Sequence, residues 1–272
     1  MRNPCLPDFE LPQNHKLFEY MRKFKYYNKN LSRLIPIITE KYKNLAMIDI
    51  GANIGDIVAI LRNDGILCPT LCIEGDEEYI YYLEKNTQMH KEVEIKKVFL
   101  GDHDAVQNMS VFRDNKGTSR LGQSTLMTNV YKLDTVLNEY PKFKMAKFLK
   151  IDTDGFDNIV LRGAEEFLKT ASPVIFMEYS VDDLFKQNDG GLEVFKYLAS
   201  IRYQKAIMYE NFGEYMFSFD INDEDFVEEM RDFFHKNERI PYADLCVFHA
   251  DDVDLFKNCR RAELDFFRKE KS

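Results

Sequence analysis

The sequence predicts an α/β fold in which helices cover both faces of a mostly parallel sheet. Two observations support this prediction. Short apolar runs, which are typical of buried strands, alternate along the chain with amphipathic stretches of helical period. Strands that alternate with helices are joined by crossover connections, which make neighbouring strands parallel. The chain of 272 residues is long enough for one large domain of this kind.

The N-terminal part of the chain is expected to be helical. Apolar side chains recur three or four positions apart from about residue 14 to residue 43, and Pro36 should break or kink this helix. We therefore divide the chain into an N-terminal helical extension (1–45), a main domain (46–250), and a C-terminal helix and tail (251–272).

The main domain is expected to begin with alternating strands and helices. The predicted strands are 46–50, 71–74, 94–100, 148–152 and 174–179. The predicted helices are 55–63, 77–89, 157–169 and 190–201. A hairpin of strands 203–210 and 214–220 should follow, because Phe212 and Gly213 suit a tight connection. The last predicted elements are a helix at 226–235, a strand at 244–249 and a helix at 253–267.

Composition argues against several classes of protein. The odd number of cysteines, five, disfavours a disulfide framework, and we expect Cys68 and Cys72 to be buried small residues rather than metal ligands. The net charge of -9 disfavours a nucleic-acid-binding surface. No apolar run approaches the roughly 20 residues that span a bilayer, and residues 1–10 have no secretion-type apolar segment. We therefore expect a cytoplasmic protein.

One segment departs from this acidic average. Between Lys16 and Lys43 there are eight basic residues and only two acidic ones. The plain interpretation is a solvated helix face. The alternative is a peripheral contact between this helix and anionic lipid or a lipid-linked glycan.

Functional side chains are expected just after the strands, because ligands of an open doubly wound sheet bind beyond the carboxyl ends of its strands. The first predicted strand contains Asp49 and leads into a loop with Gly51, Asn53, Gly55 and Asp56. The two glycines permit a sharp turn and a close approach of the backbone to a ligand. The loop is too sparse in glycine for a pyrophosphate cofactor, and the Asp49 carboxylate suits a cationic amino-acid ligand instead. A plain strand–loop–helix turn is the alternative.

Two further acids follow the second and third strands. Glu74 comes roughly 20 residues after Gly51, a spacing that places an acid to accept hydrogen bonds from both hydroxyls of a ribose. Gly75 comes next in the chain. Asp102 could accept a hydrogen bond from the amino group of an adenine, although a polar turn would also explain it. With the glycine loop, these acids indicate a nucleoside-like ligand over the first strand.

The fourth and fifth strands end in acidic residues as well. Asp157 is explained as a helix cap, whereas Asp152 and Asp154 are not needed for folding and repel each other. We therefore expect Asp152 to belong to the site. Glu178 stands at the end of an otherwise apolar strand and is a further candidate.

Several sequence segments together carry a family resemblance. The most specific is Phe-Leu-Lys-Ile-Asp-Thr-Asp-Gly at 148–155 with Val-Leu-Arg-Gly-Ala at 160–164. The others are 48–55, 72–76, 83–86, 100–102, 133–137 and 174–179. With these segments, the chain resembles the FkbM family of methyltransferases. It departs from the family pattern in Gly75, where proline is usual, and in Phe156, which places a bulky side chain near the site.

The resemblance implies a seven-stranded, Rossmann-like class I methyltransferase sheet, here with an N-terminal helical extension. It also implies S-adenosyl-L-methionine as cofactor and methyl transfer to an oxygen. Because family acceptors include surface glycans and secondary metabolites, we expect a hydroxyl of a sugar or glycan, with a polyketide-type or other small metabolite as the alternative. The expected cofactor-binding residues are Asp49, Gly51, Asn53, Gly55, Asp56, Glu74, Gly75 and Asp102.

A sugar hydroxyl is a poor nucleophile, so a general base should assist the transfer. Asp152 is the first candidate for this base and Glu178 the second, ahead of His103 and His249. A different hypothesis gives Asp152 and Glu178 to a divalent metal that binds two vicinal hydroxyls. The segment 113–128 either lines the acceptor pocket or is a plain hairpin connection. An NAD-type oxidoreductase and a non-catalytic scaffold are the remaining alternatives.

Overall fold

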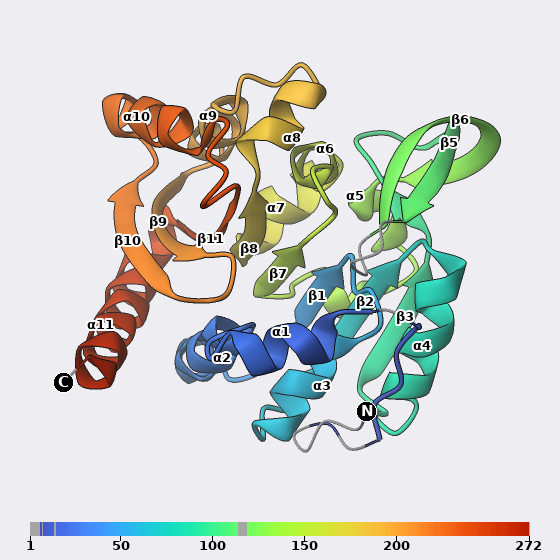
Figure 1. The fold of residues 1–272 in the computed structure, drawn as a ribbon, viewed down its shortest axis with the longest axis horizontal. Coiled ribbons are helices and arrows are strands. Elements are labelled where there is room, and N and C mark those ends of the chain that lie inside the picture. The colour runs from blue at the N-terminus through green and yellow to red at the C-terminus, as the bar shows by residue number, and fades with distance from the viewer. Residues whose placement is uncertain (1–5, 7, 14, 114–118, 272) are drawn as a thin grey trace.

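An eight-stranded sheet forms the centre of the computed structural model (Figure 1). The structure describes residues 6, 8–13, 15–113 and 119–271, with the backbone alone for 107–113 and 119–127. Across the sheet the strands are β10 (Tyr215–Asp220), β9 (Tyr203–Glu210), β11 (Ala243–His249), β8 (Val174–Tyr179), β7 (Phe148–Ile151), β1 (Met47–Ile50), β2 (Thr70–Glu74) and β3 (Val93–Lys97).

The strands from β8 to β3 pair in parallel, as the alternation of strands and helices predicts. Strand β11 is antiparallel to both β8 and β9, and β10 is antiparallel to β9. The α/β fold is therefore confirmed, but the described sheet has eight strands where seven were expected. The additional strand is β10, the second strand of the predicted hairpin, which pairs at the edge of the sheet.

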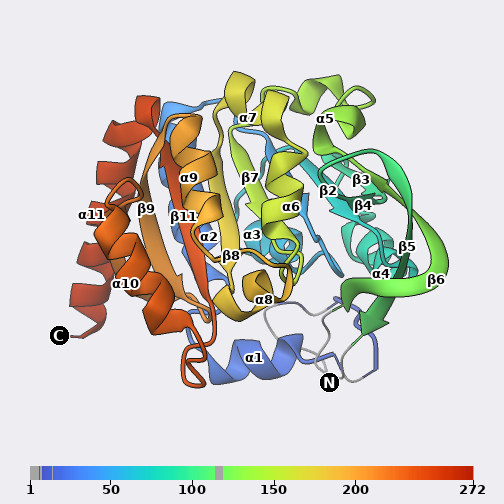
Figure 2. The ribbon, with the colours of Figure 1, turned by 90° about the horizontal axis from the view of Figure 1, so that it is seen from above.

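Helices cover both faces of this sheet. One face carries α2 (Lys29–Lys41), α3 (Asp56–Asn63), α4 (Glu77–Thr87) and α11 (Val253–Glu270). The other carries α5 (Leu133–Val136), α6 (Asp157–Arg162), α7 (Glu165–Ala171), α8 (Val181–Lys186), α9 (Glu193–Ser200) and α10 (Glu224–Phe234). Figure 2 shows α6, α7 and α9 in front of the sheet and α2 and α3 behind it.

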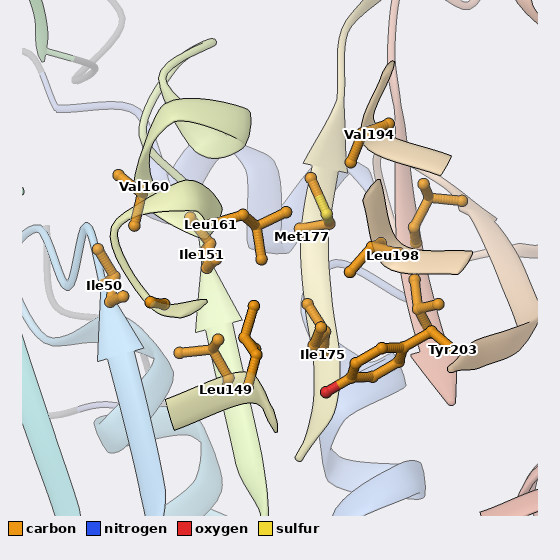
Figure 3. Packing of buried hydrophobic residues seen from close by; sticks show 14 of the residues in the cluster. Ile50, Leu149, Ile151, Val160, Leu161, Ile175, Met177, Val194, Leu198 and Tyr203 are labelled. Carbon is orange, nitrogen blue, oxygen red and sulfur yellow. The ribbon is translucent and has the colours of Figure 1, made fainter. Parts of the chain in front are cut away.

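Alternate residues of each strand point to opposite faces of the sheet, and this alternation decides which side chains form the core. Ile50, Leu149, Ile151, Ile175 and Met177 pack with the helices of the second face (Figure 3). Each fully buried side chain of this kind contributes about 1.5–3 kcal/mol to the stability of the fold. The intervening positions face the helices of the first face, α2, α3 and α11. The acidic side chains at the strand ends belong to these intervening positions.

The predicted N-terminal helix is wrong in one respect. It is divided into α1 (Leu17–Lys23) and α2, and the interruption lies at residues 24–28 rather than at Pro36, which lies inside α2. Phe24 has an extended backbone that ends α1, and Asn28, with a φ of 55° in the left-handed region, directly precedes α2. The helix continues through Pro36 because Leu34 and Ile35 are fully buried against the sheet, and this packing outweighs the hydrogen bond that proline cannot make.

Two other predicted elements are also divided. Residues 94–100 belong to β3 and to β4 (Phe99–Leu100), which pairs with β6 (Ser119–Tyr131) in a second sheet that also contains β5 (Ala105–Arg113). Residues 157–169 form α6 and α7, because the Asp134 carboxylate accepts hydrogen bonds from two backbone N–H groups at the start of α7, each at 3.0 Å. The segment 113–128 falls at the end of β5 and in β6, while 114–118 and the side chains up to 127 lie outside the described residues.

Several basic side chains of the N-terminal segment form ion pairs with the rest of the molecule. Arg33 lies 2.8 Å from Glu263 of α11, and Lys29 lies 2.8 Å from Asp64. Lys41 binds Asp252 and Asp254 at 2.8 and 2.7 Å. These pairs attach α2 to α11 and to the end of α3, and the contact with anionic lipid stays a prediction. In the described part of the chain, no helix is both long enough and apolar enough to cross a membrane.

Candidate active site

A pocket, here called the glycine-loop pocket, opens at the carboxyl ends of β1, β2 and β7. Its lining combines glycines, acids and apolar side chains, as a nucleoside site requires. The lining residues are Ile50, Gly51, Asn53, Ile73, Glu74, Gly75, Val98, Phe99, Leu100, Asp152, Thr153, Asp154 and Phe156. The expected residues Gly51, Asn53, Glu74 and Gly75 therefore lie together, with Asp152 at the same pocket.

The carboxylate of Glu74 fastens the loops of this pocket to each other. One oxygen, Oε1, accepts the backbone N–H groups of Gly75 and Asp76, each at 2.8 Å. The other oxygen, Oε2, accepts the N–H of Asn53 at 2.8 Å. Burial raises the pKa of Glu74, and these three hydrogen bonds oppose the shift. Because an ionised carboxylate offers about four acceptor positions, Oε2 can accept one further hydrogen bond.

Gly51 is the point at which the β1 and β7 loops touch. Its φ of 69° is in the left-handed region, and a Cβ at this position would overlap the backbone oxygen of Asp152. Any other residue would separate the two loops or strain the backbone. The close contact fixes Asp152 beside the glycine loop.

A buried ion pair supports the loop from below. Asp49 is fully buried, and its Oδ1 lies 3.1 Å from the ammonium nitrogen of Lys150, which is 6% exposed. The strand register places these two residues directly opposite each other on β1 and β7. Burial raises the pKa of Asp49 to about 6 against the effect of Lys150. Asp49 lines neither this pocket nor the adjacent one, so in this structure its partner is Lys150 rather than a position open to ligand.

Lys150 is a site residue that the sequence analysis missed. Its ammonium group lies 3.5 Å from Oδ2 of Asp152 and 3.4 Å from the carbonyl oxygen of Gly51. Burial opposes the positive charge, but the carboxylates of Asp49, Asp152 and Asp56 outweigh it and raise the pKa of Lys150. The signal in the sequence was the position of Lys150, which precedes Asp152 by two residues and so points to the same face of the sheet.

Besides Asp49, three further expected cofactor-binding residues lie outside the glycine-loop pocket. Gly55 packs against Leu83 and Thr87 of α4, and Asp56 accepts a hydrogen bond from the Asn28 side chain at 3.3 Å. Asp102 is exposed, and its Oδ1 lies 2.6 Å from Nδ1 of His103. None of the three is in the lining of the glycine-loop pocket.

The third-strand region contributes an aromatic ring instead of an acid. Phe99 lines the glycine-loop pocket, and its ring lies against Gly75, where a Cβ would overlap it. Val98 and Leu100 extend this apolar wall. The wall suits the flat face of a base. Phe99 was not predicted as a site residue, because the run 94–100 has the pattern of one long strand.

A second pocket, here called the acidic pocket, adjoins the first. The two pockets share Gly51, Asn53, Asp152 and Asp154. The other lining residues are His15, Leu17, Tyr20, Tyr27, Asn28, Asp56, Ile57, Lys150, Glu178, Asp183, Asn211, Phe212, Tyr242 and Asp244. A ligand in either pocket would therefore meet the side chain of Asp152, which is 53% exposed.

Three carboxylates stand side by side at the strand ends that form the acidic pocket. Asp152 follows β7 at the level of Glu178, since Ile151 pairs with Met177. Glu178 in turn pairs with Asp244 across β8 and β11. Burial, and then the neighbouring carboxylates with Asp152 first among them, raises the pKa of both Glu178 and Asp244 well above the usual range. Predicted residues Asp152 and Glu178 are thus brought together, and Asp244 joins them.

The N-terminal segment and the β9–β10 turn form the opposite wall of the acidic pocket. Phe24 stacks on Phe212, with ring centroids 3.3 Å apart. Gly213 has a φ of 89°, and a Cβ there would overlap the backbone oxygen of Tyr26. In Figure 1, α1 lies on one side of β7 and β8, and α8 lies on the other. Periodicity gave no signal for these wall residues, since their contact depends on how distant segments pack.

Within the described part of the chain, no complete ligand set supports a metal ion at Asp152 and Glu178. Among the described residues, no three His, Cys, Asp or Glu side chains converge as a bound metal ion would require. His249 is buried beside Tyr203 and lies outside both pockets, and His103 is exposed next to Asp102.

Comparison with solved structures gives distant likenesses. A methyltransferase FkbM from Methylobacillus flagellatus KT is 16% identical, with a TM-score of 0.41, over 60% of this chain and 40% of that protein. The chain thus spans less than half of that relative. A putative O-methyltransferase from Klebsiella pneumoniae is 11% identical over 91% of each chain, with a TM-score of 0.47. The plantazolicin methyltransferase BpumL in complex with SAH is 10% identical over 85% of this chain and 88% of that one, with a TM-score of 0.44.

A search of curated proteins found no match. The sequence model of the methyltransferase FkbM domain, in contrast, matches residues 49–238, well over half of the chain. The matched range contains every residue that lines the glycine-loop pocket. The chain therefore belongs to the FkbM family of S-adenosylmethionine-dependent methyltransferases.

Proposed function

We propose that the protein methylates a hydroxyl group of a sugar or glycan that binds in the acidic pocket. The observation that carries this proposal is the junction of the two pockets at Asp152. A cofactor in the glycine-loop pocket and an acceptor in the acidic pocket would meet there, on the two sides of shared residues. Holding two reactants in this relation lowers the barrier by several kcal/mol.

The glycine-loop pocket fits the parts of S-adenosylmethionine. The free acceptor position of Glu74 suits a ribose hydroxyl, and the apolar wall around Phe99 suits the adenine. The glycine loop, with Gly51 and Asn53 in the lining, would hold the amino-acid part. When bound, this cofactor supplies an electrophilic methyl group, and the acceptor oxygen gains it as the carbon–sulfur bond breaks.

Asp152 is the best candidate for the general base. Its side chain is half exposed, lines both pockets and is held by Lys150, whose ammonium lies 3.5 Å away. It can take the proton of the acceptor hydroxyl as the new bond forms. Glu178 is less suited to this role, because it lines only the acidic pocket.

The polar character of the acidic pocket favours a sugar over a polyketide-type acceptor. Carboxylates and tyrosine hydroxyls line it, and such groups form many hydrogen bonds with a polyol. An apolar metabolite would leave these groups without partners at a cost of about 1–3 kcal/mol each. A secondary metabolite bearing a sugar would meet the same requirement.

Two measurements test the proposal. Calorimetry should show binding of S-adenosylhomocysteine by the intact protein, and incubation with S-adenosylmethionine should transfer methyl to sugar acceptors in a panel of free and glycosylated compounds. Activity that survives exhaustive EDTA treatment would rule out a divalent metal at Asp152 and Glu178. Methylation of aglycone hydroxyls alone would contradict a sugar acceptor.

A further inference from the structure

We propose that the acceptor carries a protonated amine, so that the protein prefers an amino sugar with a free amino group to its neutral counterpart. The amine would lie against the carboxylates of β8 and β11, within the acidic pocket. This inference rests on the proposed function and specifies its substrate class.

The first argument is the charge of the pocket. Its lining contains six carboxylates, Asp56, Asp152, Asp154, Glu178, Asp183 and Asp244, but only Lys150 and His15 as basic residues. The positive charge of Lys150 is already engaged by the buried Asp49, 3.1 Å away. Burial lowers the pKa of His15, and its Nδ1 accepts the N–H of Leu17 at 3.2 Å, as a neutral imidazole does. Lys186 pairs with Asp183 at 2.6 Å from outside the lining, and the acidic side chains of the pocket still outnumber the basic groups around them.

The second argument concerns the partners of Glu178 and Asp244. Among the described residues, no Lys, Arg or His forms an ion pair with Glu178 or Asp244. These two residues are direct neighbours across β8 and β11, where like charges destabilise a sheet. A cation from outside the chain would remove this repulsion. A neutral sugar would not.

The third argument is the aromatic character of the facing wall. Tyr20, Tyr27, Phe212 and Tyr242 line the same pocket as the carboxylates. The faces of aromatic rings attract ammonium groups, and rings combined with carboxylates are a common way to bind amines. This feature is independent of the acids and also points to an organic cation.

A metal ion is a poorer occupant than an amine. The described carboxylates do not converge in the group of three or more that could hold a metal. They are distributed along adjacent strands, which lie about 4.7–4.9 Å apart. An ammonium group with three donors can contact acids that are spread in this way, and the rest of the sugar can occupy the space toward Asp152.

The test measures binding rather than turnover. The protein, saturated with S-adenosylhomocysteine, is titrated by calorimetry and by NMR with glucosamine and galactosamine, and in parallel with their N-acetyl forms. We expect the free amines to bind at least about tenfold more tightly, the ratio that one charge-assisted hydrogen bond provides. Glu178→Gln and Asp244→Asn should each reduce this preference several-fold. Glu228→Gln, which neutralises an exposed acid on α10, should leave it unchanged.

The outcomes separate the inference from the proposed function. If S-adenosylhomocysteine binds but the amines bind no better than their N-acetyl forms, or do not bind, the inference is overturned and the proposed function stands. A protein that fails to bind S-adenosylhomocysteine overturns both. Should one variant fail to fold, the comparison of amine with N-acetyl form in the wild-type protein still decides the matter.

Discussion

The substitution Glu74→Gln tests how the glycine-loop pocket is held together. The Glu74 carboxylate accepts three backbone N–H groups, from Asn53, Gly75 and Asp76, each at 2.8 Å. A glutamine amide has one acceptor oxygen and one donor NH₂ group. Whichever way the amide is oriented, at least one backbone N–H faces the NH₂ group and loses its acceptor.

The expected loss of stability follows from this geometry. A hydrogen bond to a charged group contributes about 1.5–3 kcal/mol, and one or two such bonds are lost. Removing the buried charge offsets part of the loss, because burial already raises the pKa of Glu74. We therefore expect Glu74→Gln to lower the free energy of unfolding by about 2 kcal/mol. Because the tied loops carry the pocket, affinity for S-adenosylhomocysteine should fall by at least about tenfold.

Urea unfolding of the two proteins measures the stability, and calorimetry measures the affinity. Asp102→Asn is the matched control, since it removes one negative charge from an exposed site outside the pocket. It should change neither quantity appreciably. If Glu74→Gln unfolds within about 0.5 kcal/mol of the wild type, the range of an ordinary surface substitution, the reasoning about the loops is refuted.

The other predictions concern the charges around the site. Lys150→Met should destabilise the protein by about 3–5 kcal/mol in urea unfolding, because it leaves Asp49 buried without its partner, and a second change, Asp49→Leu, should restore much of the loss. Asp152→Asn should lower the turnover number by about 10²–10⁴-fold with little change in S-adenosylhomocysteine affinity; an equal loss of both would contradict a role as base. Burial, and then Asp152, raises the pKa of Asp157 from 3.8 to about 7. The folded protein therefore holds a proton that the unfolded chain releases, so stability should fall as pH rises from about 4 to about 7, and Asp157→Asn should flatten that slope.

Periodicity predicted the fold well where packing acts along one strand or helix. The apolar runs at β1, β2, β7 and β8 were found because both faces of each strand are buried, and this leaves a continuous signal in the sequence. It failed at residues 94–100, where nothing local marks the division. Phe99 and Leu100 leave the main sheet because they pair with Val130 and Tyr131, about 30 residues further along the chain.

The role of Asp49 shows a second limit of sequence reasoning. An acid at the end of a buried strand suits a ligand contact and a buried ion pair equally well, and only the strand register distinguishes them. That register places Asp49 opposite Lys150. Lys150 belongs to the segment that is most specific to the family. Part of that segment therefore stabilises the glycine loop through the buried ion pair, in addition to lining the pocket.

The two pockets differ in where their residues come from, and this difference explains why the reaction was easier to infer than the acceptor. The glycine-loop pocket lies wholly within residues 49–238, the range that matches the family. The acidic pocket draws part of its wall from outside that range, namely His15, Leu17, Tyr20, Tyr27, Asn28, Tyr242 and Asp244. The family assignment therefore specifies the methyl donor, while segments beyond the matched domain form part of the pocket in which we propose that the acceptor binds. Acceptor choice should consequently be more sensitive to changes in α1, in the 24–28 loop and at Asp244 than to conservative changes around Glu74.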